Sequence, residues 1–451
     1  MSVYFSYSQS QLKSLAQRVI SQAISAGATS ANVIFSEANG LHIEMRQAVV
    51  RTRTLHAASG MSLTVFRGQH QGTTTSSDFS DKGLEETVQA AMRIARFTGV
   101  DEFCDLFAPS PLPATLPELD LYHPWSISEQ DAIALATEIE AGIHSVSPEV
   151  TSDGAWVSAG QSQLWLMNSL GFSQGTVQTH HAMTAKALGR RHHMSQLDFW
   201  SSEGNAAESL MPAYNVGSTA AQGACLALDI QPLAGNHRLP VLFAPLAATS
   251  LLSHLVQATS GAILYQGNSY LCGQLGSVIA AAHITVTEDP FIPRGLASRL
   301  FDGDGIRGKK RKIVENGRLL GYFLSAYSAR RMNMDSTGNA WGPGNLRLTS
   351  GLTRAEDDFN AMLNKLDNGL VISQFSGGSP NLMNGDYSRS LRGFWVENGK
   401  IQYAVDGITV AGNLADIFKG ILAVGNDAVT EGPFTTGSVL IDSLQISGNQ
   451  V

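Results

Sequence analysis

The hydrophobic positions near the start of the chain repeat with the spacing of a helix. Apolar residues at 12, 15, 16, 19, 20, 23 and 24 follow the i, i+3, i+4 pattern of one helical face, and Gly27 stands where such a helix ends. The same spacing predicts a second helix over 80–97. Between them the segments 31–37, 41–56 and 61–75 alternate partly with period two and are rich in Val, Ile and Thr, which predicts strands.

A proline-rich stretch then interrupts the pattern. Pro109, Pro111, Pro113, Pro117 and Pro124 are too closely spaced for a helix or a central strand, so this stretch is predicted to be a connection.

The earlier arrangement returns after the connection. Ser128 suits the N-cap of a helix that reaches His144. Strands are predicted near 153–158, 161–168 and 172–188, and another helix near 218–229. The two halves look like related units, although no sequence identity between them is strong enough to identify a duplication.

The last part of the chain is rich in hairpin signals. It begins after 228–240, and Asn316-Gly317 and Asn398-Gly399 each separate two strand-like segments, as type I′ turns require. Strands are predicted over 400–412 and 438–447. The sequence therefore predicts an α+β protein. An N-terminal helix/β-meander region in two related-looking halves (1–107 and 128–232, joined by the connection 108–127) precedes a β-rich C-terminal domain with hairpins (233–451).

Composition narrows the classes of function. The 451 residues are 43% apolar, include 44 glycines, and carry a net charge of −8. This balance argues against direct binding of nucleic acid or an anionic membrane, because phosphate contacts need clustered Lys and Arg. Three cysteines without a C-x-x-C pair argue against a cysteine zinc cage and against a disulfide framework. With no signal-peptide pattern and no apolar run of membrane-spanning length, we expect a cytoplasmic protein.

Several local patterns resemble metal-binding or catalytic motifs, but none of them is strong evidence for a site. His180-His181 and His192-His193 are adjacent pairs whose side chains point to opposite faces of a strand, so surface or loop positions are expected. Asp302-Gly303-Asp304 resembles a calcium loop but lacks the last acidic ligand, which favours a tight turn. The basic run 307–312 leads into the first Asn-Gly hairpin and is expected to be a solvated strand end. Tyr387-Ser388-Arg389 supplies hydroxyls without an identifiable base.

The segment 246–261 has the length and pattern of a buried helix followed by a glycine turn. Its one ionisable side chain is His254. A lone histidine on an apolar helix is usually a core residue with its hydrogen bonds satisfied, and this is the interpretation we favour over a ligand role.

At this helix and at several longer motifs the chain resembles the TldD/PmbA family of bacterial proteins, in particular its PmbA (TldE) branch. The motifs extend over almost the whole chain. They include GTTTSSDFS (72–80), GLASRLFDGDGIR (295–307), LSAYSARRM (324–332), NGDYSRSLRGFWVENGKIQYAV (384–405), ITVAGNL (408–414) and VGND (424–427).

The resemblance implies a definite test for a metal site. Members of the TldD branch are zinc peptidases with a His-Glu-x-x-x-His motif on a helix and a cysteine ligand near the C-terminus. Superposing that helix on 246–261 places the first histidine at Ser253, the glutamate at His254 and the second histidine at Ala258, with the cysteine at Gly425. A shift by one residue puts His254 in the first ligand position. Leu255 and Thr259 then hold the remaining two, so the site is incomplete in both placements.

The resemblance therefore implies a metal-free partner subunit. A TldD-type catalytic subunit would supply the zinc, and the pair would process or degrade unfolded peptides, as in peptide maturation. We expect the glycine-rich stretch with Gly377, Gly378, Gly385 and Asp386 to lie at the peptide-binding surface, although a plain surface loop explains it equally well. Two alternatives remain: an independent metallohydrolase with unrecognised ligands, and a non-enzymatic modulator of a DNA-gyrase-related system. A homodimer in isolation is also compatible with the resemblance.

Overall fold

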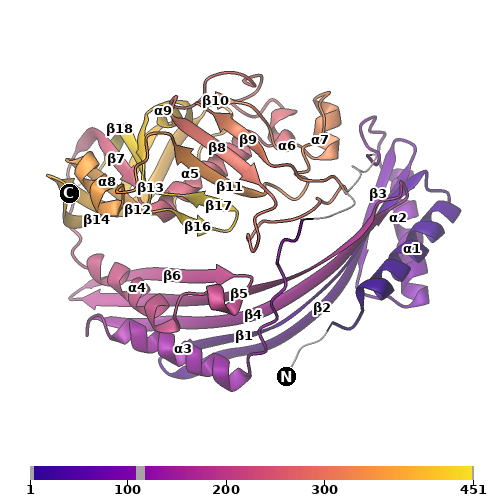
Figure 1. The fold of residues 1–451 in the computed structure, drawn as a ribbon, viewed down its shortest axis with the longest axis horizontal. Helices are drawn as coiled ribbons and strands as arrows, with labels where there is room; N and C mark the ends of the chain where they lie inside the picture. The colour runs from indigo at the N-terminus through magenta and orange to yellow at the C-terminus, as the bar shows by residue number, and fades with distance from the viewer. Residues whose placement is uncertain (1–4, 108–116, 449–451) are drawn as a thin grey trace.

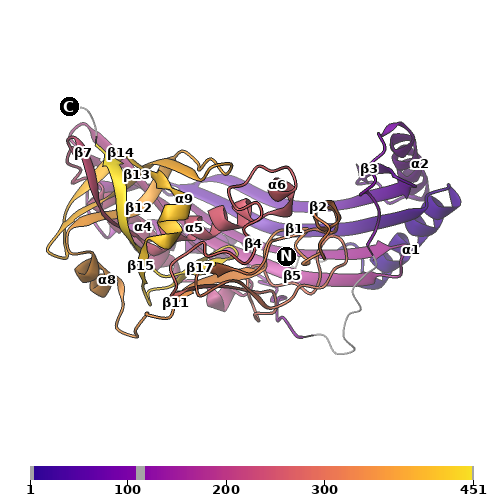
Figure 2. The ribbon, with the colours of Figure 1, turned by 90° about the horizontal axis from the view of Figure 1, so that it is seen from above.

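The computed structural model describes residues 5–107 and 117–448, so the connection residues 108–116 lie outside it. Figure 1 shows one long, curved N-terminal sheet and a C-terminal region that lies against its concave side. Figure 2 shows the same arrangement from above, with α1 (Gln9–Ser25) and α2 (Asp81–Phe97) at one end of the sheet, away from the C-terminal region. The predicted α+β class is confirmed.

The N-terminal sheet is antiparallel throughout and joins both predicted halves. Its strand order is β3-β2-β1-β4-β5-β6, and the central pair β1–β4 connects the first half to the second. The predicted division into 1–107, 108–127, 128–232 and 233–451 stays a prediction. The strands are β1 (Ser30–Arg46), β2 (Val49–Arg67), β3 (His70–Ser76), β4 (Val150–Asn168), β5 (Ser173–Arg191) and β6 (Met194–Gly204).

The strand boundaries correct the sequence-based prediction. The segments 31–37 and 41–56 were expected to be separate strands, but β1 runs unbroken through 38–40 and the chain turns at Gln47-Ala48. Likewise β4 covers the predicted gap between 158 and 161. Gly40 and Gly160 lie opposite each other in these two strands. A Cβ at Gly40 would lie 2.5 Å from the Ala159 carbonyl oxygen, so glycine here permits a close approach of backbones rather than a turn.

Four helices cover one face of the sheet. Two of them, α1 and α2, pack on Val33, Phe35 and Leu63. The other two, α3 (Glu129–His144) and α4 (Ala213–Leu226), pack on Ile43 and Val157 further along the strands. Ser128 caps α3 as predicted, while α4 begins five residues before the predicted 218 because Pro212 precedes its first turn. A short 3₁₀ helix (Ala207–Ser209) precedes α4.

The opposite face of the sheet meets the C-terminal region. Leu166 and Phe172 of this face pack against Phe301, whose ring centroid lies 5.0 Å from that of Phe172. The aromatic contact therefore joins the two parts of the molecule.

The C-terminal region contains two six-stranded sheets around a large apolar core. One has the order β14-β13-β12-β7-β18-β15, and β14 also pairs with β18, so five strands close into a small barrel. The other has the order β10-β9-β8-β11-β17-β16. The strands are β7 (Asn236–Phe243), β8 (Ile284–Asp289), β9 (Arg311–Glu315), β10 (Arg318–Leu319), β11 (Asn345–Ser350), β12 (Gly369–Gly377), β13 (Asp386–Glu397), β14 (Lys400–Asn413), β15 (Ile421–Val424), β16 (Val429–Glu431), β17 (Phe434–Thr436) and β18 (Val439–Ser447).

Both Asn-Gly turns are confirmed. Asn316-Gly317 joins β9 to β10, Asn398-Gly399 joins β13 to β14, and all four residues have positive φ. The helices of this region are α5 (Pro245–Ala258), α6 (Gly261–Leu264), α7 (Ala326–Arg331), α8 (Phe359–Leu366) and α9 (Leu414–Lys419). In the part of the chain that the structure describes, no helix is long and apolar enough to cross a membrane.

Candidate functional site

Helix α5 is the predicted buried helix, and it lies in the core of the C-terminal region. Pro245 occupies its first turn, and it packs against strands β7 and β12 of the barrel and against β16 and β17 of the second sheet. The Thr249 hydroxyl donates a hydrogen bond of 2.6 Å to the Glu431 carboxylate on β16. The helix is therefore held from two sides, which fixes where its side chains point.

His254 is buried on α5, with 6% of its surface exposed. Its ring meets that of Tyr387 on β13 edge-on, with 5.8 Å between centroids. Burial, and secondly the positive charge of Arg389, lower the pKa of His254 to about 4, so the imidazole is neutral near pH 7. The prediction that His254 lies in the core is confirmed. The prediction that its hydrogen bonds are satisfied is wrong, because His254 Nδ1 has no hydrogen-bond partner among the described residues.

The other residues to which the resemblance assigns the zinc motif carry no metal-binding chemistry. Ser253 is partly exposed and its hydroxyl accepts a hydrogen bond from the Gln257 side chain at 3.2 Å. Ala258 is completely buried. In the shifted placement, Leu255 is an apolar core residue and the Thr259 hydroxyl donates to the Leu255 carbonyl oxygen. Neither placement assembles a ligand set on α5.

Gly425 follows β15 in a place with no room for a side chain. A Cβ there would lie 2.2 Å from Asp427 Oδ1 and 2.6 Å from Ser438 Oγ. The backbone N–H of Gly425 donates to the Ser438 carbonyl oxygen at 2.8 Å, which fixes this close packing. A cysteine would not fit without displacing the β17–β18 connection.

Zinc does not fit the residues present at this place. Within residues 5–107 and 117–448, no three His, Cys, Asp or Glu side chains are arranged to hold a metal ion. One neutral imidazole among apolar groups supplies neither the charge nor the number of ligands that zinc requires.

The glycine-rich stretch lies beside the start of β13, whose Tyr387 contacts His254 on α5. It forms the loop between β12, which ends at Gly377, and β13, which begins at Asp386. Gly378 has φ +80°, and a Cβ there would lie 2.5 Å from the Ser388 carbonyl oxygen, next to Tyr387. Gly385 has φ +82°, and the Asp386 carboxylate accepts a hydrogen bond from the Asn384 side chain at 2.6 Å. The loop therefore adjoins the start of β13, where the neighbouring residue Tyr387 contacts His254.

Arg389 is the residue of this site that the sequence-based prediction missed. It extends from β13 and its guanidinium carbon lies 3.8 Å from the ring centroid of Phe375 on β12. The Tyr387-Ser388-Arg389 tripeptide was considered only for its hydroxyls. The alternation of Tyr387, Arg389 and Leu391 along one strand is the signal that places an arginine on the apolar face.

Two of the other local patterns have structural roles. Asp302 is fully buried, and its carboxylate accepts hydrogen bonds from the backbone N–H groups of Asp304, Ile306 and Ala340, which confirms the predicted tight turn. Burial, followed by the nearby charge of Asp304, raises the pKa of Asp302 to about 6. In the basic run, Lys309 and Lys310 are exposed, but the expectation of a solvated strand end is wrong for Arg311, which forms an ion pair of 2.7 Å with buried Glu288.

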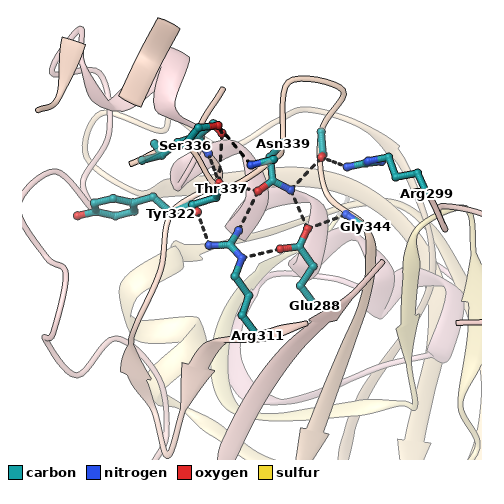
Figure 3. A network of polar contacts seen from close by, with 11 residues as sticks. Glu288, Arg299, Arg311, Tyr322, Ser336, Thr337, Asn339 and Gly344 are labelled. Atoms are coloured by element: carbon teal, nitrogen blue, oxygen red, sulfur yellow. Dashed lines mark hydrogen bonds and ion pairs between the residues drawn. The ribbon is translucent and has the colours of Figure 1, made fainter. Parts of the chain in front are cut away.

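The Arg311–Glu288 pair belongs to a polar network, which Figure 3 shows. Arg311 also donates to the Tyr322 carbonyl oxygen at 2.8 Å and to Asn339 Oδ1 at 3.0 Å, and Asn339 Nδ2 donates to the Glu288 carboxylate at 2.7 Å. The Gly344 N–H donates to the same carboxylate at 2.7 Å. The network holds both ends of the segment 339–344, which carries Trp341.

Trp341 lines a pocket of about 560 Å³ between the long sheet and the C-terminal region. Leu164 and Val177 form the wall on the sheet, and Leu300 and Phe301 form the opposite wall together with Trp341. Charged residues, among them Asp120 and Arg299, also line this pocket, so its walls are mixed in polarity.

A second pocket, of about 420 Å³, lies on the helix-covered face of the sheet, and Tyr122, Trp125 and His181 line part of it. His181 is 1% exposed and its Nε2 lies 2.9 Å from the His123 carbonyl oxygen, so the expectation of a surface or loop position is wrong for this residue. His180, on the opposite face of β5, is exposed and contacts Glu203, and His192-His193 form the turn before β6.

The fold and the sequence match a metallopeptidase family. Three sequence profiles match this chain: the PmbA/TldA metallopeptidase domain 1 over residues 31–95, the central domain over 122–228 and the C-terminal domain over 236–448. The metalloprotease PmbA of Escherichia coli O157:H7 is 34% identical over 93% of this chain and 92% of its own length.

Solved structures agree with this match. A Bacteroides thetaiotaomicron protein proposed to modulate DNA gyrase superposes with a TM-score of 0.91 at 25% identity, over 97% of this chain and 99% of the other. TldE from Thermococcus kodakarensis superposes with a TM-score of 0.85 at 18% identity, over 96% and 100% of the two chains, which shows the common fold. The chain belongs to the PmbA/TldD family of metalloproteases.

Proposed function

We propose that this chain is the metal-free partner subunit of a TldD/TldE-type metallopeptidase and contributes scaffold and peptide binding. The observation that carries the proposal is the composition of α5 and its surroundings. The resemblance assigns the zinc motif to Ser253, His254 and Ala258, or one residue later to His254, Leu255 and Thr259, and neither set could hold zinc. Gly425 is packed too tightly for a cysteine. A TldD-type subunit would supply the zinc and the general base. On this view the pair works in the cytoplasm, and a homodimer of this chain forms only without its partner.

The substrate would be an unfolded peptide used in maturation or degradation. Two features support binding of an extended chain. The loop with Gly377, Gly378, Gly385 and Asp386 adjoins the start of β13, whose Tyr387 contacts α5, the helix to which the resemblance assigns the metal motif. In addition, β3 pairs only with residues 61–67 of β2, so among the described residues the segment 49–60 has no strand on its outer side. Strand addition binds a peptide through its main chain, independently of sequence.

Mixing experiments test the proposal. The purified chain, a purified TldD-type subunit and their mixture are compared for hydrolysis of an unstructured peptide. We expect hydrolysis by the mixture well above the sum of the separate subunits. A matched control uses a TldD-type subunit in which the glutamate of its His-Glu-x-x-x-His motif is changed to Gln, which should abolish the activity of the mixture. Equal rates with and without this chain would contradict the proposal.

The independent metallohydrolase makes a different prediction. It requires about one equivalent of tightly bound metal in the purified chain and peptide hydrolysis without a partner. Metal analysis of the chain alone, before and after dialysis against a chelator, separates the two functions. A stoichiometric metal that dialysis removes together with hydrolytic activity would favour the independent enzyme.

A further inference from the structure

Four side chains from three elements form a cluster at the centre of the site, which we call the Arg389 cluster. It consists of His254 on α5, Phe375 on β12, and Tyr387 and Arg389 on β13. The Tyr387 ring meets both neighbours edge-on, with 5.8 Å to the centroid of His254 and 6.3 Å to that of Phe375. The Arg389 guanidinium stacks on Phe375. Packing by aromatic rings holds the arginine in one place.

The polar atoms of this cluster are buried without hydrogen-bond partners among the described residues. They are His254 Nδ1, the Tyr387 hydroxyl and Arg389 Nε. Tyr387 is 1% exposed, and burial raises its pKa to about 12, so the hydroxyl keeps its proton. The charge of Arg389 opposes this shift, as does a side-chain contact with Arg389 that falls short of hydrogen-bond geometry. Buried polar groups are usually satisfied, because each unmade hydrogen bond is costly. Three such atoms in one place indicate a ligand that would complete them.

The charge of the cluster is positive and unopposed. Arg311 and Arg392 of the same region form ion pairs with Glu288 and Asp406. In contrast, none of the ion pairs within residues 5–107 and 117–448 includes Arg389, which is only half-buried. A half-buried guanidinium without a carboxylate, beside two neutral groups that can donate hydrogen bonds, has the chemistry of an anion-binding site.

We propose that the Arg389 cluster binds a carboxylate of an extended peptide. Arg389 would form the charge-assisted hydrogen bonds, the Tyr387 hydroxyl would donate one more, and His254 could donate from Nδ1 in the tautomer that carries its proton there. That the ligand is a peptide rests on the proposed function. The cluster then lies at the helix to which the resemblance assigns the metal motif, and it anchors the substrate instead of cleaving it.

The loop beside the cluster suits an extended ligand. Gly378 lies against the Ser388 carbonyl oxygen with no side chain between this loop and β13. Ser388, which precedes Arg389, is exposed. Arg389 points to the opposite face of β13 but is only half-buried, so a peptide beside this strand can contact its guanidinium. The carboxylate comes either from the C-terminus of the peptide or from an Asp or Glu side chain, and the same chemistry recognises both.

The test measures binding of labelled peptides by fluorescence anisotropy with the full chain. Three unstructured peptides of about ten residues are compared. The first lacks acidic side chains and ends in a free carboxylate, the second is its C-terminal amide, and the third is the amide with one internal Glu. The variants are Arg389→Met, Arg389→Lys and Tyr387→Phe. Arg347→Met, the same change at an exposed arginine on β11, is the matched control.

For the wild-type chain we expect the free acid to bind about tenfold tighter than the amide. Arg389→Met should remove this preference and Arg389→Lys should keep part of it, while Arg347→Met keeps all of it. Tyr387→Phe, which preserves the packing, should reduce the preference by about threefold. If the third peptide binds as tightly as the first, an acidic side chain serves as well as the C-terminus.

Two results would overturn the inference. Equal binding of acid and amide by the wild-type chain would refute the carboxylate site but leave the peptide-binding subunit intact. A preference that persists in Arg389→Met would place the carboxylate elsewhere. Failure of the wild-type chain to bind any of the three peptides would instead contradict the peptide-binding role in the proposed function.

Discussion

The His254 imidazole on α5 packs edge-on against the Tyr387 ring on β13, with 5.8 Å between the ring centroids. This contact joins a helix and a strand that are far apart in the sequence. It also determines the chemistry of the site, because burial keeps His254 neutral and leaves its Nδ1 without a partner among the described residues.

The neutral state of His254 predicts a dependence of stability on pH. Its pKa is about 4 in the folded chain and near 6.5 when unfolded, so between these values the unfolded chain binds a proton that the folded chain does not. The contribution of neutral His254 to the free energy of unfolding is therefore complete above pH 6.5. It is lost as the pH falls toward 4, and the loss is at most about 3 kcal/mol. We expect His254→Gln to flatten the free energy of unfolding over this range, as measured by urea titration.

The control for this prediction is His193→Gln, at an exposed turn position. Only the difference between each variant and the wild type is interpreted, since Asp302, whose pKa is raised to about 6, acts in the opposite direction over an overlapping range. Identical pH profiles for His254→Gln and the wild type would show that His254 does not titrate abnormally.

The crowding at Gly425 predicts that the cysteine of the catalytic branch is not tolerated. Gly425→Ala should lower the free energy of unfolding by about 2 kcal/mol or more, because its Cβ would lie 2.2 Å from Asp427 Oδ1. Gly99→Ala is the matched control, since a Cβ at Gly99 meets nothing within 4 Å. Thermal and urea unfolding measure both. Equal stability of the two variants would mean that the β17–β18 connection moves easily.

The sequence predicts those parts of the fold that local chemistry determines. Ser128 caps α3, and Asn316-Gly317 and Asn398-Gly399 form their hairpins, because each depends on neighbouring residues alone. The continuity of β1 through Gly40 does not follow from local pattern, since a glycine within a strand can indicate either a break or a close backbone approach. The pairing of Gly40 with Gly160 shows that β1 continues here and that the two backbones approach closely.

The residues of the candidate site also differ in whether the sequence alone can predict them. The resemblance to the family directs attention to His254, Ser253 and Ala258, because the motif it implies lies on one helix. Arg389 becomes visible only when β12, β13 and α5 are placed together, since nothing near Arg389 in sequence identifies Phe375 or His254 as its neighbours.

The adjacent glycines of the β12–β13 loop predict a matched pair of variants. Gly378→Ala should destabilise the chain by about 1–3 kcal/mol, because Gly378 has φ +80° and its Cβ would lie 2.5 Å from the Ser388 carbonyl oxygen. Gly377→Ala should have little effect, since a Cβ there meets nothing within 4 Å. If the loop lies at the peptide surface, Gly378→Ala also weakens peptide binding in the anisotropy assay. Unchanged peptide affinity in a folded Gly378→Ala variant would remove the loop from that surface.

The network around Glu288 predicts a larger loss of stability than that expected for Gly378→Ala. Glu288→Gln removes a carboxylate that is almost fully buried and accepts from Arg311, Asn339 and Gly344. Breaking one side of a buried pair costs about 3–5 kcal/mol, because the remaining charge is uncompensated. Loosening of the segment 339–344 should also increase solvent exposure of Trp341, which shifts its fluorescence to longer wavelength.

The control for the network is Lys312→Met. Lys312 follows Arg311 on β9, and the substitution removes its exposed ion pair with Glu315. Such a surface pair contributes at most about 1 kcal/mol, so the stability should change little and the fluorescence of Trp341 not at all. Trp341→Phe identifies the part of the emission that belongs to this side chain. Glu288→Gln with wild-type stability and emission would show that the remaining hydrogen bonds are sufficient to hold the segment, and that the ion pair adds nothing to the wall of the 560 Å³ pocket.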